Sequence, residues 1–138
     1  TNRYWSPPNP VPSHGTASLL RYLREVFNYN REFRLSTPGY ELEAMPDLFL
    51  EAATAVTSLT LDDNNIQKLP DAIGTFTLLS ELFSITDNQL LELPRQVGNL
   101  TSLVRMRLTG NRLSSIPVEV SELTCLTLLT LDHNRLTD

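Results

Sequence analysis

The 138-residue sequence contains a single cysteine, Cys125, so no disulfide can form within the chain. Disulfides are common in small secreted domains and rare in reducing compartments, which favours an intracellular, cytoplasmic protein. Lysine is equally scarce: the sequence has one lysine, Lys68, and ten arginines. Arginine suits planar, bidentate contacts with carboxylates, although a GC-rich genome would produce the same bias.

Long apolar runs, glycine-rich loops and sets of metal ligands are also missing. No apolar stretch approaches the roughly 20 residues of a membrane-spanning helix, so no membrane insertion is expected. The five glycines are isolated from one another, which excludes a phosphate-binding loop. Two histidines and one cysteine are too few to hold a metal. A net charge of −5 disfavours nucleic acid as a partner. We therefore expect no cofactor, no metal and no nucleic acid.

What the sequence does contain is a repeat marked by Asn64, Asn88, Asn111 and Asn134, at separations of 24, 23 and 23 residues. Each asparagine closes the pattern Leu-x-Leu-x-x-Asn or a near copy, and an apolar residue and a Leu-Pro or Ile-Pro step follow the complete copies. An upstream unit keeps the phase with Tyr40 in place of the asparagine. A repeat of this length predicts a solenoid, in which each coil buries its apolar face against the next coil.

The pattern resembles that of the leucine-rich repeat family, and the resemblance covers about three quarters of the chain. The 23-residue length and the Leu-Pro step are similar to those of intracellular, Ras-regulator-like members. The resemblance implies an α/β solenoid, a right-handed coil with a parallel β-sheet on its concave face and an irregular or short-helical convex side. It also implies a non-catalytic scaffold that binds a partner protein through the concave surface.

Three segments are expected along the chain. Residues 1–15 hold four prolines beside Tyr4 and Trp5, which predicts an extended arm that is either a flexible linker or is held by its aromatic side chains. Residues 16–32 carry apolar residues at helical spacing, which predicts an amphipathic helix. This helix either caps the first coil or ends a preceding domain. Residues 33–138 hold about four repeat units, and we expect the last to be truncated at its C-terminal end.

The repeated asparagines are expected to be structural. An asparagine amide has two donor hydrogens and an acceptor oxygen, which can satisfy backbone groups of its own coil and of the adjacent coil. One irregularity interrupts the repeat, because the stretch from Leu79 to Phe83 is one residue longer than its counterparts. The extra residue predicts a bulge at this point.

The residues beside the core positions of each strand are left for function, because side chains alternate between the two faces of a strand. The candidate partner-binding residues on the concave face are Arg105, Arg107, Asp62, Asp87, Thr86, Leu82, Leu128, Asp132 and His133. Tyr4 and Trp5 are further candidates on the arm. The two arginines lie between acidic flanks, so they either bind an acidic segment of a partner or pair with carboxylates of the chain itself.

The sequence does not predict an enzyme. Asp132 and His133 are adjacent, but neighbouring strand residues project to opposite faces and no suitably placed nucleophile accompanies them. A scaffold within a larger multi-subunit assembly is the main hypothesis. Two alternatives stay open: the targeting segment of a signalling enzyme such as a kinase, cyclase or phosphatase, and the ectodomain of an extracellular receptor. A glycan on Asn99, which begins the sequon Asn-Leu-Thr, would favour the receptor.

Overall fold

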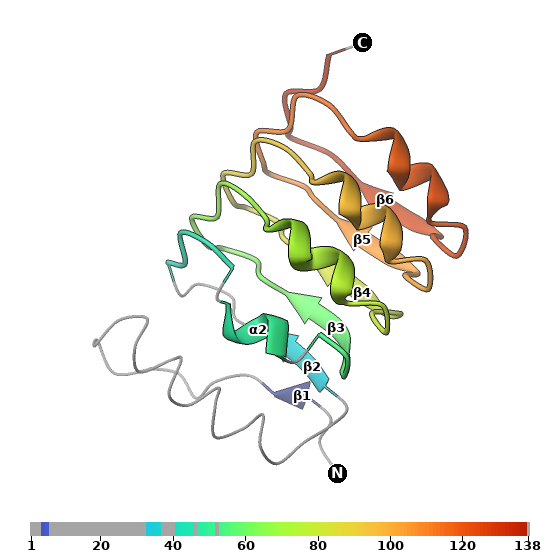
Figure 1. Cartoon of the computed structure of the whole chain (residues 1–138). Helices are drawn as coiled ribbons and strands as arrows, with labels where there is room; N and C mark the ends of the chain where they lie inside the picture. Colours follow the sequence, from blue (N-terminus) through green and yellow to red (C-terminus); the bar gives the residue numbers. More distant parts are fainter. Residues whose placement is uncertain (1–3, 6–32, 37–40, 46, 52, 138) are drawn as a thin grey trace.

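The computed structural model describes residues 4–5, 33–36, 41–45, 47–51 and 53–137. A parallel sheet with the strand order β1-β2-β3-β4-β5-β6 runs through them. Its strands are β1 (Tyr4–Trp5), β2 (Phe33–Ser36), β3 (Val56–Thr60), β4 (Leu82–Ser84), β5 (Arg105–Arg107) and β6 (Leu128–Thr130). Each strand pairs with the next one along the chain, so the solenoid grows by one strand per coil (Figure 1). The predicted parallel sheet is confirmed.

Short helical segments stack along the other side of the solenoid (Figure 1). They are α2 (Leu48–Glu51) and three 3-10 helices, η1 (Asp71–Thr75), η2 (Arg95–Asn99) and η3 (Val118–Glu122). Each 3-10 helix directly follows a proline whose φ is −70°, −66° or −65°, namely Pro70, Pro94 and Pro117. Proline holds φ in this range and has no N–H to donate, so the Leu-Pro or Ile-Pro step marks where the chain turns into the helical side.

Part of the predicted N-terminal organisation lies outside the described residues. This applies to the helix expected over 16–32 and to the arm over 1–15 apart from its backbone at Tyr4–Trp5. That backbone forms β1 and pairs in parallel with β2, with Tyr4 opposite Arg34 and Trp5 opposite Leu35. The arm therefore contributes a strand to the sheet before the first repeat.

The core lies between the sheet and the helical side. In the coil that contains Asn64, the apolar side chains with no solvent exposure are Leu59, Leu61, Ile66, Leu69, Ile73, Phe76 and Leu79. Each such side chain contributes about 1.5–3 kcal/mol when it is removed from water, which offsets the entropy lost in ordering the coil. These are the positions that the repeat pattern assigns to the core.

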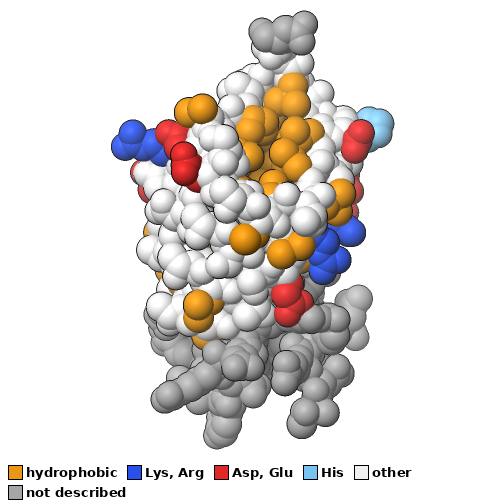
Figure 2. All heavy atoms as spheres, turned by 90° about the vertical axis from the view of Figure 1, so that its right-hand side faces the viewer, with side chains coloured by type: hydrophobic (Ala, Val, Ile, Leu, Met, Phe, Trp, Pro, Cys, Tyr) orange, Lys and Arg blue, Asp and Glu red, His pale blue; other side chains and the backbone are white. Residues whose placement is uncertain are grey.

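Burial decreases in the fourth coil. Leu129 is 36% exposed, whereas its counterparts Leu59, Phe83 and Met106 are fully buried. Figure 2 shows hydrophobic side chains gathered towards the C-terminal end of the molecule. The difference arises because no described coil packs on the outer side of β6.

The extra residue between Leu79 and Phe83 lies immediately before β4. The N–H groups of Ser80 and Glu81 both donate to the carbonyl oxygen of Thr57, at 3.1 and 2.9 Å. The Val104 N–H of the next coil then donates to the Ser80 carbonyl at 3.1 Å. The same two-donor arrangement occurs before β6, where the N–H groups of Thr127 and Leu128 donate to the Val104 carbonyl, so it is not specific to the longer stretch. Phe83 still enters the core.

Glycine allows the helical segments to stack closely. A Cβ atom added at Gly98 in η2 would lie 2.7 Å from the carbonyl oxygen of Glu119 in η3. Gly74 in η1 faces the Gln96 carbonyl of η2 in the same way, at 2.9 Å. The Asn99 side chain is also 2.8 Å from a Cβ at Gly74, whereas the closest atom at Gly98 belongs to the backbone and cannot move without shifting the neighbouring helix.

Substitution of Gly98 by alanine should therefore lower the free energy of unfolding by about 1–3 kcal/mol, the usual cost of overpacking. Urea denaturation followed by circular dichroism measures the change. The matched control is Ser121→Ala at the equivalent position of η3, which is exposed and should change stability by less than about 0.5 kcal/mol. Equal stability of the two variants would show that the helical segments separate at little cost.

Candidate functional site

The repeated asparagines join adjacent coils. The side-chain Oδ1 of Asn88 accepts from the Ile66 N–H of the preceding coil at 2.9 Å, and its Nδ2 donates to the carbonyls of Leu61 and Thr86 at 2.9 and 3.0 Å. Equivalent acceptor bonds are made by Asn64, Asn111 and Asn134 to the N–H groups of Leu42, Leu90 and Leu113. These amides serve the solenoid itself, so they are not counted among the residues that contact a partner.

The residue before each asparagine turns the chain out of its strand. Its φ is positive in all four coils: 56° at Asp63, 50° at Asp87, 71° at Gly110 and 54° at His133. Glycine and short polar residues such as aspartate tolerate this left-handed conformation best. Asp63, Asp87 and His133 are exposed there, so the turn that the backbone requires also places polar side chains at the ends of the strands.

The outward side chains of β3 to β6, which we call the sheet face, form regular rows across the strands. The register places Arg105 opposite Leu82 on one side and opposite Leu128 on the other. In the next row, Arg107 lies opposite Ser84 and Thr130. Both arginines are exposed, while Met106 between them is fully buried. The structure thus brings the two arginines and two leucines of the predicted set together.

Neither arginine has a carboxylate partner within the described part of the chain. Arg105 Nε donates to the backbone carbonyl of Glu81 at 3.4 Å, which leaves the guanidinium charge unneutralised. The ion pair found among the described residues lies elsewhere, between Lys68 and Glu92 at 3.6 Å. Two like charges two residues apart on a strand lie about 7 Å from each other. The sheet face therefore carries a local positive charge on a protein of net charge −5.

The acidic candidates differ in exposure and in the hydrogen bonds that their carboxylates accept within the chain. Asp62 Oδ1 accepts from the Ser84 hydroxyl and from the Thr86 N–H, both at 2.7 Å, so this carboxylate helps to hold the adjacent coil. Ser84 is only 1% exposed. Asp87 and Asp132 are exposed, as is His133. In Figure 2, acidic and basic side chains and a histidine lie along the right-hand rim of the molecule.

Sequence reasoning missed the Asp62–Ser84 contact. The signal in the sequence was weak. Ser58 and Ser84 are small, buried residues on the outward side of their strands, and β5 has Arg105 and Arg107 at the corresponding positions. The side chains of Tyr4 and Trp5, the predicted contacts of the arm, lie outside the described residues.

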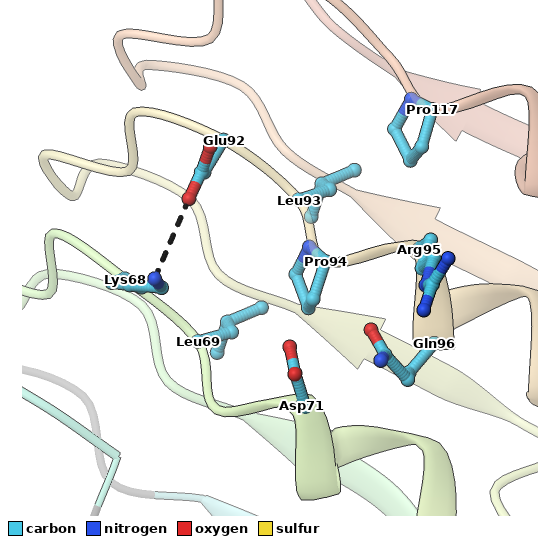
Figure 3. Close-up of a pocket in the computed structure, with 9 residues that line it drawn as sticks. All are labelled: Lys68, Leu69, Asp71, Glu92, Leu93, Pro94, Arg95, Gln96 and Pro117. Carbon is cyan, nitrogen blue, oxygen red and sulfur yellow. Dashed lines mark ion pairs between the residues drawn. The ribbon is translucent and has the colours of Figure 1, made fainter.

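A shallow hollow lies on the side where the chain leaves the strands for the helical segments (Figure 3). Its volume is about 340 Å³. Figure 3 shows the Lys68–Glu92 ion pair at one end and Arg95 and Gln96 at the other. Asp71 and the leucines and prolines of the repeat form the rest of the lining, so much of the hollow follows from the repeat. No Ser, Thr, Cys or His side chain lines it.

The described residues contain neither a metal-binding cluster nor a membrane-spanning helix. No group of three or more His, Cys, Asp and Glu side chains is arranged to hold a metal ion. No helix in this part of the structure has the length and apolar character needed to cross a membrane.

The fold is similar to that of a solved leucine-rich repeat protein from Leptospira interrogans. The match has a TM-score of 0.72 and 27% sequence identity, and it covers 87% of this chain and 28% of that chain. This chain therefore spans less than a third of the length of that protein. No protein-family model and no curated protein sequence matches the chain. The structural match agrees with the leucine-rich repeat pattern of the sequence.

Proposed function

We propose, from the leucine-rich repeat fold of this chain, that it is a non-catalytic scaffold that binds a partner protein through the sheet face. In this proposal Arg105 and Arg107 bind an acidic segment of the partner. We further propose an intracellular, cytoplasmic location and the Ras-regulator-like type of repeat. The single cysteine, which allows no disulfide within the chain, supports a reducing compartment.

One observation carries the proposal: two neighbouring, exposed guanidinium groups have no carboxylate partner among the described residues. An arginine bound to a carboxylate by two hydrogen bonds gains more than a surface ion pair does, since the geometry is fixed and the charges assist. Arginine is also enriched among the residues that dominate protein interfaces. Leu82 and Leu128 on either side of Arg105 would exclude water around the contact.

The double variant Arg105→Glu/Arg107→Glu should reduce capture of the native partner in a pull-down from cell extract by at least about tenfold, because two favourable contacts become repulsive. Thermal unfolding should shift by less than about 3 °C, since both side chains are exposed. Quantitative mass spectrometry of the captured proteins identifies the partner and measures the loss.

The matched control is Arg112→Glu/Arg135→Glu. These exposed arginines each follow a repeated asparagine, so the variant has the same charge change outside the sheet face. Capture should stay within about twofold of the unaltered chain. If the first variant captures the partner normally but unfolds at a much lower temperature, the two arginines of β5 are structural and the proposal is wrong.

A further inference from the structure

The row of Leu82, Arg105 and Leu128 places an apolar, a cationic and an apolar side chain side by side across three strands. Leu82 is half-buried and Leu128 is 36% exposed, so all three are accessible on the sheet face. Adjacent strands lie about 4.8 Å apart, which separates the two leucine backbones by about 9.6 Å. An occupant of this face must match that spacing.

An α-helix laid across the strands matches it. Helical residues three and four positions apart are about 4.5 and 6.0 Å apart along the axis, and residues seven positions apart are separated by about 10.5 Å. An extended chain presents side chains to one face at intervals of about 6.7 Å, which does not match the strand spacing of about 4.8 Å. The row therefore fits apolar residues at i and i+7 of a helix, with acidic residues between them at i+3 and i+4.

We infer that the sheet face binds an amphipathic helix of the partner, lying across β4, β5 and β6. Its two apolar residues pack on Leu82 and Leu128, and its acidic residues bind Arg105 and Arg107. This inference rests on the proposed function and adds the conformation and residue pattern of the bound segment. Charge complementarity selects an acidic helix, because neither guanidinium has a partner carboxylate in the described residues.

A second copy of the chain does not supply such a helix from the part that the structure describes. The helical segments there are α2, with four residues, and the 3-10 helices, with five residues each. None of them reaches the eight residues that span i to i+7. The described part of the chain therefore does not supply the helix.

Three peptides of about 18 residues, built on an alanine-rich helical background, test the inference. The first has leucines seven positions apart and glutamates three and four positions after the first leucine. The second has the same composition with leucines and glutamates exchanged. The third is the first peptide with a central alanine replaced by proline, which breaks the helix. Fluorescence anisotropy with the 138-residue chain measures each dissociation constant.

The first peptide should bind at least about tenfold more tightly than the second and the third. Its affinity should fall at least about tenfold with Arg105→Glu and with Leu82→Ser/Leu128→Ser, and stay unchanged with Arg112→Glu. Equal binding of all three peptides would mean that the surface attracts acidic charge without regard to pattern. That result overturns the helix inference but leaves the proposed function intact.

Two other outcomes also overturn the inference. One is an affinity for the first peptide that does not respond to Leu82→Ser/Leu128→Ser. The other is the absence of binding by any peptide at a concentration of about 1 mM, which sets a limit of roughly −4 kcal/mol on the interaction. The pull-down with Arg105→Glu/Arg107→Glu is independent of these peptides, so it still decides whether the sheet face binds a partner at all.

Discussion

Replacement of Asn111 by alanine is expected to lower the free energy of unfolding by about 3 kcal/mol. The Asn111 Oδ1 accepts from the buried Leu90 N–H at 3.0 Å, and its Nδ2 donates to the carbonyls of Ile85 and Leu108 at 2.7 and 3.0 Å. Alanine removes these bonds and a longer one to the Thr109 carbonyl at 3.4 Å. The buried Leu90 N–H then loses its side-chain acceptor, whereas the Leu108 carbonyl keeps Asn134 Nδ2 as a donor. Each unsatisfied group costs about 1–3 kcal/mol, although local relaxation and water entry reduce the sum.

The midpoint and slope of a urea unfolding curve provide the measurement. Asn65→Ala is the matched control, because Asn65 is exposed and receives only a 3.5 Å contact from the Gln89 side chain. That variant should lose less than about 0.5 kcal/mol. A similarly small loss for Asn111→Ala would mean that apolar contact alone holds the coils together and that the amide bonds are incidental.

Phe83→Ala is expected to have the largest effect of any single change proposed for this chain, a loss of about 3–5 kcal/mol. Phe83 has no solvent exposure and lies in β4, between Leu59 of β3 and Met106 of β5. Truncation removes a large apolar side chain from contact with both neighbouring coils. It also leaves a cavity that two paired strands prevent from collapsing.

The variant Phe83→Leu tests whether the loss of stability in Phe83→Ala arises from the removed volume or from the aromatic ring. The equivalent residues are Leu59 and Leu129, so leucine is compatible with this place in a coil. We expect a loss below about 1.5 kcal/mol for Phe83→Leu in the same urea experiment. Equal losses for the alanine and leucine variants would indicate that the aromatic ring makes a contact that an aliphatic side chain cannot replace.

The repeat pattern predicted the sheet and the core because it fixes the phase of every coil. Once Asn88 is aligned with Asn111, the inward positions Phe83 and Ile85 follow from the alternation of side chains. The sequence left the convex side open between irregular and short-helical structure. The 3-10 helices depend on the φ angle of the preceding proline and on the close approach of the neighbouring helix at Gly98. The distance between neighbouring helices cannot be read from the sequence of one coil.

The sheet face could be outlined from the sequence, but its electrostatics could not. Alternation indicates that Arg105 and Arg107 point outward, whereas their lack of a carboxylate partner among the described residues depends on rotamers and on neighbouring strands. Asp62 was predicted only as a candidate partner-binding residue, and the hydrogen bond that its carboxylate accepts from Ser84 in the adjacent coil was not anticipated. The pairing of Tyr4–Trp5 with β2 was also beyond reach, because a two-residue strand has no pattern of its own.

The asparagine bonds make the stability of each coil depend on that of its neighbour. Each Oδ1 accepts from the coil before it, so every coil from Leu42 to Leu113 is completed by its successor. Opening of one coil therefore removes hydrogen-bond partners from its neighbour, so adjacent coils are expected to open together. A ligand that contacts β4, β5 and β6 would bind three coupled coils at once. Binding would thus raise the resistance of these coils to local opening.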